Sequence, residues 1–485
     1  MTLTDLVTNL SATMPLNVLV VWACALLLVD LFIPEERKGL TALLAALGML
    51  VAMGFAIAQM GTQTVAFNGM VVVDGFANFL TIFFLGSGMV GVALAYDYLS
   101  RMGLQRGEYY TLLMFSISGM ILMGLAGDLI IVFLALELLS FPLYVLAGFA
   151  RPRQDSEEAA IKYFLLGAFA SGFVVYGVAL VFGATGTTAL AGIQAATQSG
   201  SADLTLLAVG AGLILVGLGF KVAAVPFHMW TPDVYQGAPS AVTAFLAVGA
   251  KAGGFAALLR VFIVAFTVLA VDFTSILWVL AALTMFLGNI VAISQGNIKR
   301  MLAYSSIAHA GYILMAFVPY GQTQVAGNAV AAALFYLLAY ALTSFAAWAV
   351  VISLEKAEGR GLAISDYAGM GRKYPLQAAV MAVAMLSFTG VPPTLGFVGK
   401  FYLFSTVIEG GFIGLAVIGV LTSLISAYYY LRVVVVMYMQ DGEPEVRRDR
   451  WVTLTAAAAG TAIVVLSIFS VPLFNWVSQA TLMGF

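Results

Sequence analysis

Apolar residues in this chain cluster in blocks of about twenty, and polar residues gather in the short stretches between the blocks. A block of that length, coiled into an α-helix, matches the thickness of the hydrocarbon core of a bilayer. The pattern predicts about fourteen membrane-spanning helices. They fall near residues 14–33, 40–60, 75–96, 109–126, 129–149, 159–183, 204–224, 240–268, 273–294, 300–319, 326–354, 375–409, 412–439 and 452–478. We therefore predict an all-α, polytopic membrane protein that forms one integral membrane domain over residues 1–485.

The stretches between the predicted spans are short, and the longest, residues 184–203, is rich in Gly, Thr and Ser and predicts a loop. Lysine and arginine follow the odd-numbered spans, whereas the loops after even-numbered spans contain neither. These basic residues are Arg37, Lys38, Arg101, Arg106, Arg151, Arg153, Lys299, Arg300, Lys356, Arg360, Arg372, Lys373, Arg447, Arg448 and Arg450. By the positive-inside rule, the odd loops face the cytoplasm of a bacterial plasma membrane, and both termini face the other side.

Two of the predicted spans are interrupted by proline. Span 7 breaks at Pro226 and is followed by a polar turn, and span 12 is interrupted at Pro392 and Pro393. Proline removes a backbone donor and so frees a carbonyl of the preceding turn, which a membrane protein tolerates where the freed group lies against protein or water. We predict broken helices at spans 7 and 12.

The two halves of the chain show a weak internal similarity. YFLLGAFASGF, beginning at Tyr163, resembles FYLLAYALTSF, beginning at Phe335, at an offset of 335 − 163 = 172 residues. At the same offset Glu137 aligns with His309, and broken span 7 pairs with broken span 12. Units displaced by five spans have opposite orientations in the membrane, and inverted repeats with one interrupted helix each indicate a transport site near the midplane. Unrelated apolar helices that match by chance are the alternative explanation.

Composition supports a membrane protein and limits its chemistry. The chain is 62% hydrophobic and only 9% charged, with a mean hydropathy of +1.04. A formal net charge of −2 predicts no nucleic-acid partner. One cysteine, Cys24, excludes an internal disulfide and a cysteine-ligated cluster, and two histidines are too few for several haems. We therefore expect no redox centre in this chain. Since no signal-peptide pattern begins the sequence, we expect the first span to be retained.

Four charged residues lie inside the predicted spans, where a charge costs about 2.5–3.5 kcal/mol at the bilayer centre. Glu137 and Lys251 lie in mid-span, and Lys221 and Lys400 lie near the predicted breaks. A charge paired for packing, or placed at a helix end, is the structural alternative. Three lysines and one glutamate cannot all be neutralised in pairs, and a lysine buried without a carboxylate generally holds its proton weakly. We predict a gated proton relay: Glu137 tunes Lys221, Lys221 exchanges with Lys251, and Lys400 lies further on.

Other polar residues are candidates for supporting roles. His309 is a group that titrates near neutral pH between the two halves, with Tyr304 and Ser306 beside it. A histidine that only makes hydrogen bonds in a helix is the alternative. His228, in the turn after Pro226, is a weaker candidate. Arg260 could contact lipid headgroups or a partner helix, and no role is assigned to it.

Three segments resemble the antiporter-like, proton-translocating membrane subunits of respiratory complex I, the NADH–quinone oxidoreductase. They read KVAAVPFHMWTPDVYQGAPSAVTAFLA, NIKRMLAYSSIAHAGYILMA and TGVPPTLGFVGKFYLF, and the resemblance covers nearly the whole chain from Val73 onward. In two of the three kinds of subunit in this family, PFHMWTPDVYQGAP typically reads more like PFHTWLPDA. One of those two kinds usually carries a glutamate where this chain has Lys400. The resemblance is therefore to the third kind.

This resemblance implies an antiporter-like fold. Its parts are three N-terminal spans (1–106), two inverted five-helix repeats at spans 4–8 (107–268) and spans 9–13 (269–440), and a C-terminal span (441–485). It also implies a proton path through Glu137, Lys221, Lys251 and Lys400, with His309 between the two halves.

The resemblance further implies partners and the location of the cofactors. Flavin, iron–sulfur clusters and quinone belong to other subunits in the family, and the partners are other membrane subunits of complex I, including sister antiporter-like subunits, and the lipid bilayer. The leading hypothesis is a subunit that moves protons while redox chemistry elsewhere drives it.

Three alternatives remain. A subunit of a multi-subunit cation/proton antiporter would share the fold, although the PDVYQGAP loop disfavours it. A related complex that takes electrons from ferredoxin or another donor is not excluded by this chain. Four buried charges argue against a purely structural scaffold.

Overall fold

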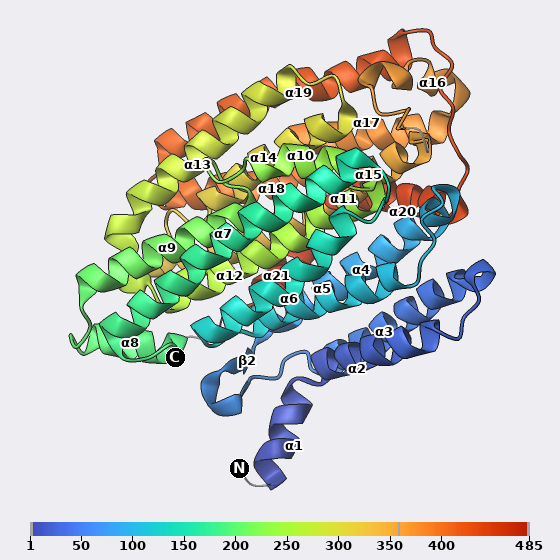
Figure 1. Ribbon diagram of the computed structural model, residues 1–485. Coiled ribbons are helices and arrows are strands. Elements are labelled where there is room, and N and C mark those ends of the chain that lie inside the picture. The colour runs from blue at the N-terminus through green and yellow to red at the C-terminus, as the bar shows by residue number, and fades with distance from the viewer. Residues whose placement is uncertain (1–2, 357–358, 483–485) are drawn as a thin grey trace.

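The computed structural model describes residues 3–356 and 359–482, and most of them lie in long helices that run side by side between two ends of the molecule (Figure 1). The helices at the predicted spans are α2 (Met14–Asp30), α3 (Gly39–Ala58), α4 (Gly75–Arg101), α5 (Glu108–Leu125), α6 (Leu129–Ala147), α7 (Gln154–Thr185), α9 (Leu204–Val222), α11 (Ser240–Phe245) with α12 (Lys251–Val264), α13 (Ala270–Ile293), α14 (Ile298–Met315), α15 (Thr323–Leu354), α17 (Pro375–Thr389) with α18 (Leu395–Glu409), α19 (Ile413–Met439) and α20 (Arg450–Ile468). The predicted all-α polytopic fold is confirmed.

The number of spans depends on three helices. Among the described residues, eleven helices are long and apolar enough to cross a membrane, or twelve if α1 (Leu3–Ala12) and α2 form one bent span. The remaining predicted spans are α14, which carries two basic residues in its first turn, and the pair α17 and α18, which have 15 residues each. The count of fourteen therefore stays a prediction.

Both predicted helix breaks are present. Helix α9 ends at Val222, where Ala223 adopts a left-handed conformation (φ 63°), and the chain resumes as the short helix α10 (Trp230–Gly237). Helix α17 ends at Thr389, where the cap residue Gly390 is also left-handed (φ 88°), and α18 follows the two prolines. Between α11 and α12, a π-helical turn spans Leu246–Ala250. Such turns leave helical hydrogen bonds irregular and occur frequently at functional sites.

The prediction of a loop over residues 184–203 is wrong. Helix α7 continues to Thr185, and a second helix, α8 (Leu190–Gln198), follows after a short turn. Leu190 and Ile193 are buried three residues apart, so this short helix is anchored by its apolar face despite its polar composition. A short hairpin of β1 (Thr64–Ala66) and β2 (Val71–Val73) is a further element that the apolar pattern does not predict.

The loops form two distinct ends. Arg101 Nη1 donates to the Glu355 carbonyl oxygen at 2.7 Å, and Arg447 N donates to the Ser353 carbonyl oxygen at 2.8 Å, so loops that carry basic residues meet one another. At the other end, Gly127 N donates to the Met70 carbonyl oxygen at 2.9 Å. In Figure 1, α16 (Met370–Lys373) lies at the first end, and β2 and α8 lie at the second. We call the first end, which holds Arg37, Arg101, Arg153, Arg300, Lys356 and Arg447, the basic face.

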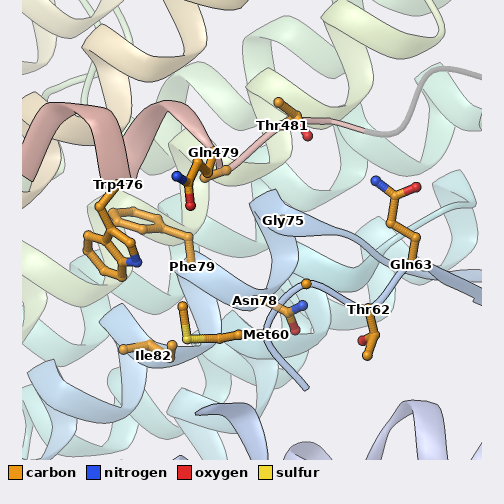
Figure 2. Close-up of a pocket in the computed structure, with 12 residues that line it drawn as sticks. Met60, Thr62, Gln63, Gly75, Asn78, Phe79, Ile82, Trp476, Gln479 and Thr481 are labelled. Carbon is orange, nitrogen blue, oxygen red and sulfur yellow. The ribbon is translucent and has the colours of Figure 1, made fainter. Parts of the chain in front are cut away.

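The chain's last helix closes the second end. Helix α21 (Ser470–Ser478) places Trp476 against Phe79, with ring centroids 5.1 Å apart, and Thr481 accepts a hydrogen bond from Phe76 N at 3.1 Å. Figure 2 shows this arrangement around a small cavity at the start of α4. Gly75 is required here, since a Cβ would lie 2.5 Å from the Gln479 carbonyl oxygen.

Arg260 does not reach lipid or a partner helix, which corrects the expectation from sequence. Its side chain is 0% exposed and donates to both carboxylate oxygens of Asp74 and to the carbonyl oxygen of Gly124. The pair joins α12 to the start of α4 and the end of α5.

Candidate functional site

Lys221 lies in the last turn of α9, directly before the first helix break, and is almost completely buried. Its Nζ donates hydrogen bonds to Ser140 Oγ at 2.7 Å and to Tyr163 OH at 3.0 Å. The rings of Tyr144 and Tyr163 lie 5.9 and 5.3 Å from the amine. The Lys221 amine is therefore surrounded by neutral oxygens and aromatic rings.

Glu137 lies one turn before Ser140 on α6, so the two residues share a face of that helix. Its Oε1 accepts a hydrogen bond from Ser171 Oγ of α7, and its side chain is half-buried. Glu137 is close enough to interact electrostatically with Lys221, but no ion pair within 4.0 Å joins the two among the described residues. Glu137 and Lys221, the predicted tuning pair, therefore lie close together in the structure, and Ser140 lies beside both.

Lys251 begins α12 immediately after the π-helical turn and is 2% exposed. Its Nζ donates to the backbone carbonyl oxygen of Ser306 on α14. A carbonyl has two lone pairs, so Ser306 can accept this bond and still take part in its helix. Gly254, one turn further along α12, packs directly on Lys221, since a Cβ there would lie 3.3 Å from Lys221 Cβ and Cγ. Lys221 of α9 and Lys251 of α12 therefore lie on two helices that are in direct contact.

His309 lies one turn after Ser306 on α14 and is buried. Its Nδ1 is 2.7 Å from Tyr336 OH, and its Nε2 is 3.1 Å from Tyr430 OH. A neutral imidazole has one donor and one acceptor nitrogen, and a hydroxyl can serve as either, so both ring nitrogens are satisfied in either tautomer. This is the arrangement that a histidine needs to accept a proton on one side and release one on the other.

Lys400 lies on α18, after the second break, and is 4% exposed. Its Nζ donates to the carbonyl oxygens of Phe388 and Thr389 and to Ser423 Oγ, each at 2.9 Å. The two carbonyls belong to the last turn of α17, whose acceptors have no partner within the helix. The ring of Tyr312 lies 4.6 Å from the amine.

The three lysines share one property. Among the described residues, none of Lys221, Lys251 and Lys400 forms an ion pair, and each amine binds only neutral oxygen atoms. By contrast, Arg260, which forms an ion pair with Asp74, is a buried charge that is paired for packing.

Two supporting candidates lie apart from this arrangement. His228 lies in the turn after the first helix break, and its side chain is buried there. Its Nδ1 has no hydrogen-bond partner among the described residues. Tyr304 is half-exposed and makes none of the hydrogen bonds described above. Ser306, the third, contacts Lys251 through its backbone, and its hydroxyl lies 3.4 Å from Tyr235 OH.

The sequence alone missed the neutral partners of the charged residues. Ser140, Tyr163, Tyr336, Tyr430 and Ser423 each place a hydroxyl on a lysine or on His309. Their common signal is a hydroxyl inside an otherwise apolar block, but many other hydroxyls in the chain share it.

The expectation that Lys299 lies in a loop is wrong. The sequence places it in a loop, whereas the structure buries it completely in the first turn of α14, with Nζ 2.6 Å from the Ala238 carbonyl oxygen.

Two carboxylates outside the spans have shifted pKa values. The hydrogen bond from Lys356 holds the pKa of Glu445 below its ordinary value. Burial raises the pKa of Asp449, although Arg101 opposes that effect. These groups lie at the basic face, away from the buried lysines.

Comparisons with known proteins converge on one family. The family described as NADH:quinone oxidoreductase/Mrp antiporter, TM, matches residues 126–426. The chain is 48% identical to NADH-quinone oxidoreductase subunit N of Trichlorobacter lovleyi, over 94% of this chain and 92% of that protein. It is 46% identical to the protein of the same name from Chloroflexus aggregans, over 96% of each chain.

Solved structures agree. A chain of respiratory complex I from Thermus thermophilus with bound aureothin is 36% identical, with a TM-score of 0.82 over 96% of this chain and 99% of that one. A chain of the Mrp complex from Dietzia sp. DQ12-45-1b has a TM-score of 0.83 over 97% of each chain, at 21% identity, which shows a shared fold alone.

Proposed function

This chain belongs to the NADH:quinone oxidoreductase/Mrp antiporter family of membrane proteins, and from that premise we propose that it is a proton-translocating membrane subunit of a bacterial NADH–quinone oxidoreductase. Its partners are the other membrane subunits of that complex, including sister antiporter-like subunits. Flavin, iron–sulfur clusters and the quinone site belong to those partners, and redox chemistry there drives proton movement here.

One observation carries the proposal. Three lysines are buried inside the helix bundle with neutral hydrogen-bond partners only. Taking an ammonium out of water is costly without a carboxylate beside it, so a chain would not hold three such amines for packing. A buried amine that can be either charged or neutral is a proton carrier.

The relay follows from the geometry of these groups. When Glu137 approaches Lys221, the amine is stabilised as an ammonium, and when it withdraws, the amine releases its proton towards Lys251. From Lys251 the proton passes along α14 to His309, whose two tyrosine hydroxyls can each donate and accept. It then reaches Lys400 beside the second break. Water that enters at the two breaks connects groups that lie beyond direct contact.

The proposal includes the arrangement in the membrane. Helices α5 and α6 pack against each other, as do α13 and α14, and each half contains one broken helix, which supports inverted repeats at residues 107–268 and 269–440. The basic face then lies on the cytoplasmic side, and both termini lie on the other side.

A tagged copy of the chain, purified in mild detergent from its native membranes, tests the proposal. NADH-driven quinone reduction, flavin and iron–sulfur signals should accompany it. In that preparation, Lys221→Met and Glu137→Gln should assemble normally and lower proton pumping and its coupled quinone reduction. Full, normally coupled activity in both variants would rule out the relay.

The second candidate is a subunit of a multi-subunit cation/proton antiporter, which the shared fold with the Mrp complex supports. In that case the chain would copurify with other hydrophobic subunits but with no redox cofactor. Its activity would then depend on the cation supplied.

A further inference from the structure

A buried carboxylate at the basic face takes no part in the relay described above. Glu355 follows the last residue of α15, and its side chain is 0% exposed. Its Oε2 accepts a hydrogen bond from Tyr98 OH at 2.9 Å, whereas its Oε1 lies 3.9 Å from Arg153 Nη1 and has no hydrogen-bond partner among the described residues. A carboxylate buried only for packing requires partners for its lone pairs, and this one retains an open acceptor.

Lys299 accompanies this carboxylate. It is completely buried, interacts electrostatically with Glu355, and donates to the carbonyl oxygen of Ala238 at 2.6 Å. Tyr98 OH, which donates to Glu355, accepts a hydrogen bond from Ser240 N at 3.1 Å. Glu355 and Lys299 are therefore both connected to the junction between α10 and α11, which leads into the helix that carries Lys251.

The surroundings of Glu355 suit water. Besides Glu355 Oε1, the hydroxyls of Ser240 and Tyr367 are buried and lack hydrogen-bond partners among the described residues. Tyr367 is close enough to Glu355 to interact electrostatically. Polar atoms left in this way mark a place that accommodates ordered water, and such water conducts protons between fixed groups.

A polar cavity lies beside this cluster. It has a volume of about 290 Å³, and its lining includes Leu354 and Lys356, the residues on either side of Glu355 in the chain. Asp366, Glu443 and Glu445 supply carboxylates to the same cavity. Carboxylates that line a cavity on the basic face place negative charge at the mouth of any path that starts there.

On the inner side, α14 leads from the cluster to the relay. Lys299, Ser306 and His309 are spaced by seven and then three residues, which places them on one face of the helix. Lys299 and Ser306 are about 10 Å apart along the helix axis at 1.5 Å per residue. Ser306 accepts the hydrogen bond from Lys251, so this face of α14 contacts the lysine that the relay uses.

We propose that Glu355 is the carboxylate through which protons enter the relay from the basic face, and that Lys299 and Tyr98 are its positioning residues. A proton moves from water in the cavity to Glu355 Oε1, which becomes a carboxylic acid. The acid then releases a proton inward, through water along α14, to the neutral amine of Lys251. One proton enters and one leaves, and no electron is transferred. The inference rests on the proposed function.

The charge of Glu355 depends on every titratable or charged group that faces it. Among the described residues, these groups are Tyr98 and Arg101 of α4, Arg153 before α7, Lys299 of α14 and Tyr367 of the turn Ile364–Tyr367.

The test uses the intact complex reconstituted in lipid vesicles, with quinone reduction and proton pumping measured from about pH 6 to about pH 9. Glu355→Gln keeps the shape of the side chain but cannot carry a proton, and we expect it to lower pumping by roughly tenfold, with the loss growing as the pH rises. Glu355→Asp should restore much of it. Asp441→Asn, at an exposed carboxylate on the same face, is the matched control and should match the wild type.

The outcomes separate the inference from the proposed function. If Lys221→Met abolishes pumping and Glu355→Gln pumps normally across the pH range, the entry site is overturned and the function stands. If both variants pump normally, the proposed function itself fails. If Glu355→Gln does not assemble, Tyr98→Phe decides, because it leaves the carboxylate but removes its hydrogen bond. A displaced pH profile supports the entry site, and an unchanged profile overturns it.

Discussion

Arg260 and Asp74, 186 residues apart in the sequence, form a bidentate ion pair that is completely buried. The guanidinium also lies over the ring of Phe76, 4.8 Å from its centroid. Asp74 is the cap of α4, where it accepts a hydrogen bond from Ala77 N at 2.8 Å. The pair thus fixes α12, which carries Lys251 at its other end, to the start of α4.

Breaking this pair should destabilise the protein without changing the relay. Arg260→Gln leaves the Asp74 carboxylate buried opposite a neutral group, and we expect the free energy of unfolding to fall by about 3–5 kcal/mol. Thermal unfolding of the purified complex measures the effect. Arg372→Gln, which breaks an exposed pair with Asp441, should leave the midpoint nearly unchanged. Equal effects of the two variants would contradict this assignment.

The tyrosine hydroxyls that contact His309 should matter more for proton pumping than for the stability of the protein. Tyr430→Phe removes the hydroxyl that lies 3.1 Å from Nε2 and keeps the ring, and we expect coupled pumping to fall by about tenfold or more. Tyr402→Phe is the control, since Tyr402 stacks on Phe474 and makes no hydrogen bond through its hydroxyl among the described residues. Vesicle pumping assays compare the two. Normal pumping in Tyr430→Phe would exclude this hydroxyl from the path.

The contact between Gly254 and Lys221 predicts a spacing effect. In Gly254→Ala, the added methyl would lie 2.8 Å from Val222 Cγ1 and 3.3 Å from the Lys221 stem, so Val222 must shift and Lys221 must move slightly with it. We expect lower pumping with normal assembly. Gly172→Ala adds its methyl to open space on α7 and should have no such effect. Normal pumping in Gly254→Ala would show that the spacing between α9 and α12 is not critical, and a similar loss in both variants would show that the effect does not come from this contact.

The orientation proposed above predicts which loops are accessible from outside. In a Cys24→Ser background, Ser199→Cys lies on the exposed end of α8, and Glu443→Cys is exposed on the basic face. A membrane-impermeant maleimide should label the first in intact cells and the second only after permeabilisation. The reverse pattern would invert the orientation.

Asp449 predicts a pH dependence of stability. Burial raises its folded-state pKa above the ordinary value of 3.8, so the folded state binds its proton more tightly than the unfolded state. The resulting stabilisation is fully present below pH 3.8 and is lost as the pH rises through the folded-state pKa. Asp449→Asn should therefore unfold with a weaker pH dependence in this acidic window. Thermal midpoints measured across that window check it, and parallel curves would contradict it.

The sequence alone determined the elements of the fold that depend on local physical constraints. Apolar blocks have the length that a bilayer requires, so the positions of the helices could be predicted. Pro226 and Pro393 lie in the two breaks, where the missing backbone donor disfavours a continuous helix, although α6 continues through Pro142. The prediction of a loop over residues 184–203 was wrong because Leu190 and Ile193 are stabilised by burial against other helices. Amino-acid composition does not reveal such burial.

Only the tertiary structure decided which charges are paired. Lys251 and Arg260 lie nine residues apart in the same span, yet one binds a neutral carbonyl and the other a carboxylate from α4. Lys299 has the sequence context of a loop residue but is buried by α10. The energy of a buried charge depends on atoms within a few ångströms, and helix packing supplies those atoms from segments that are remote in the chain.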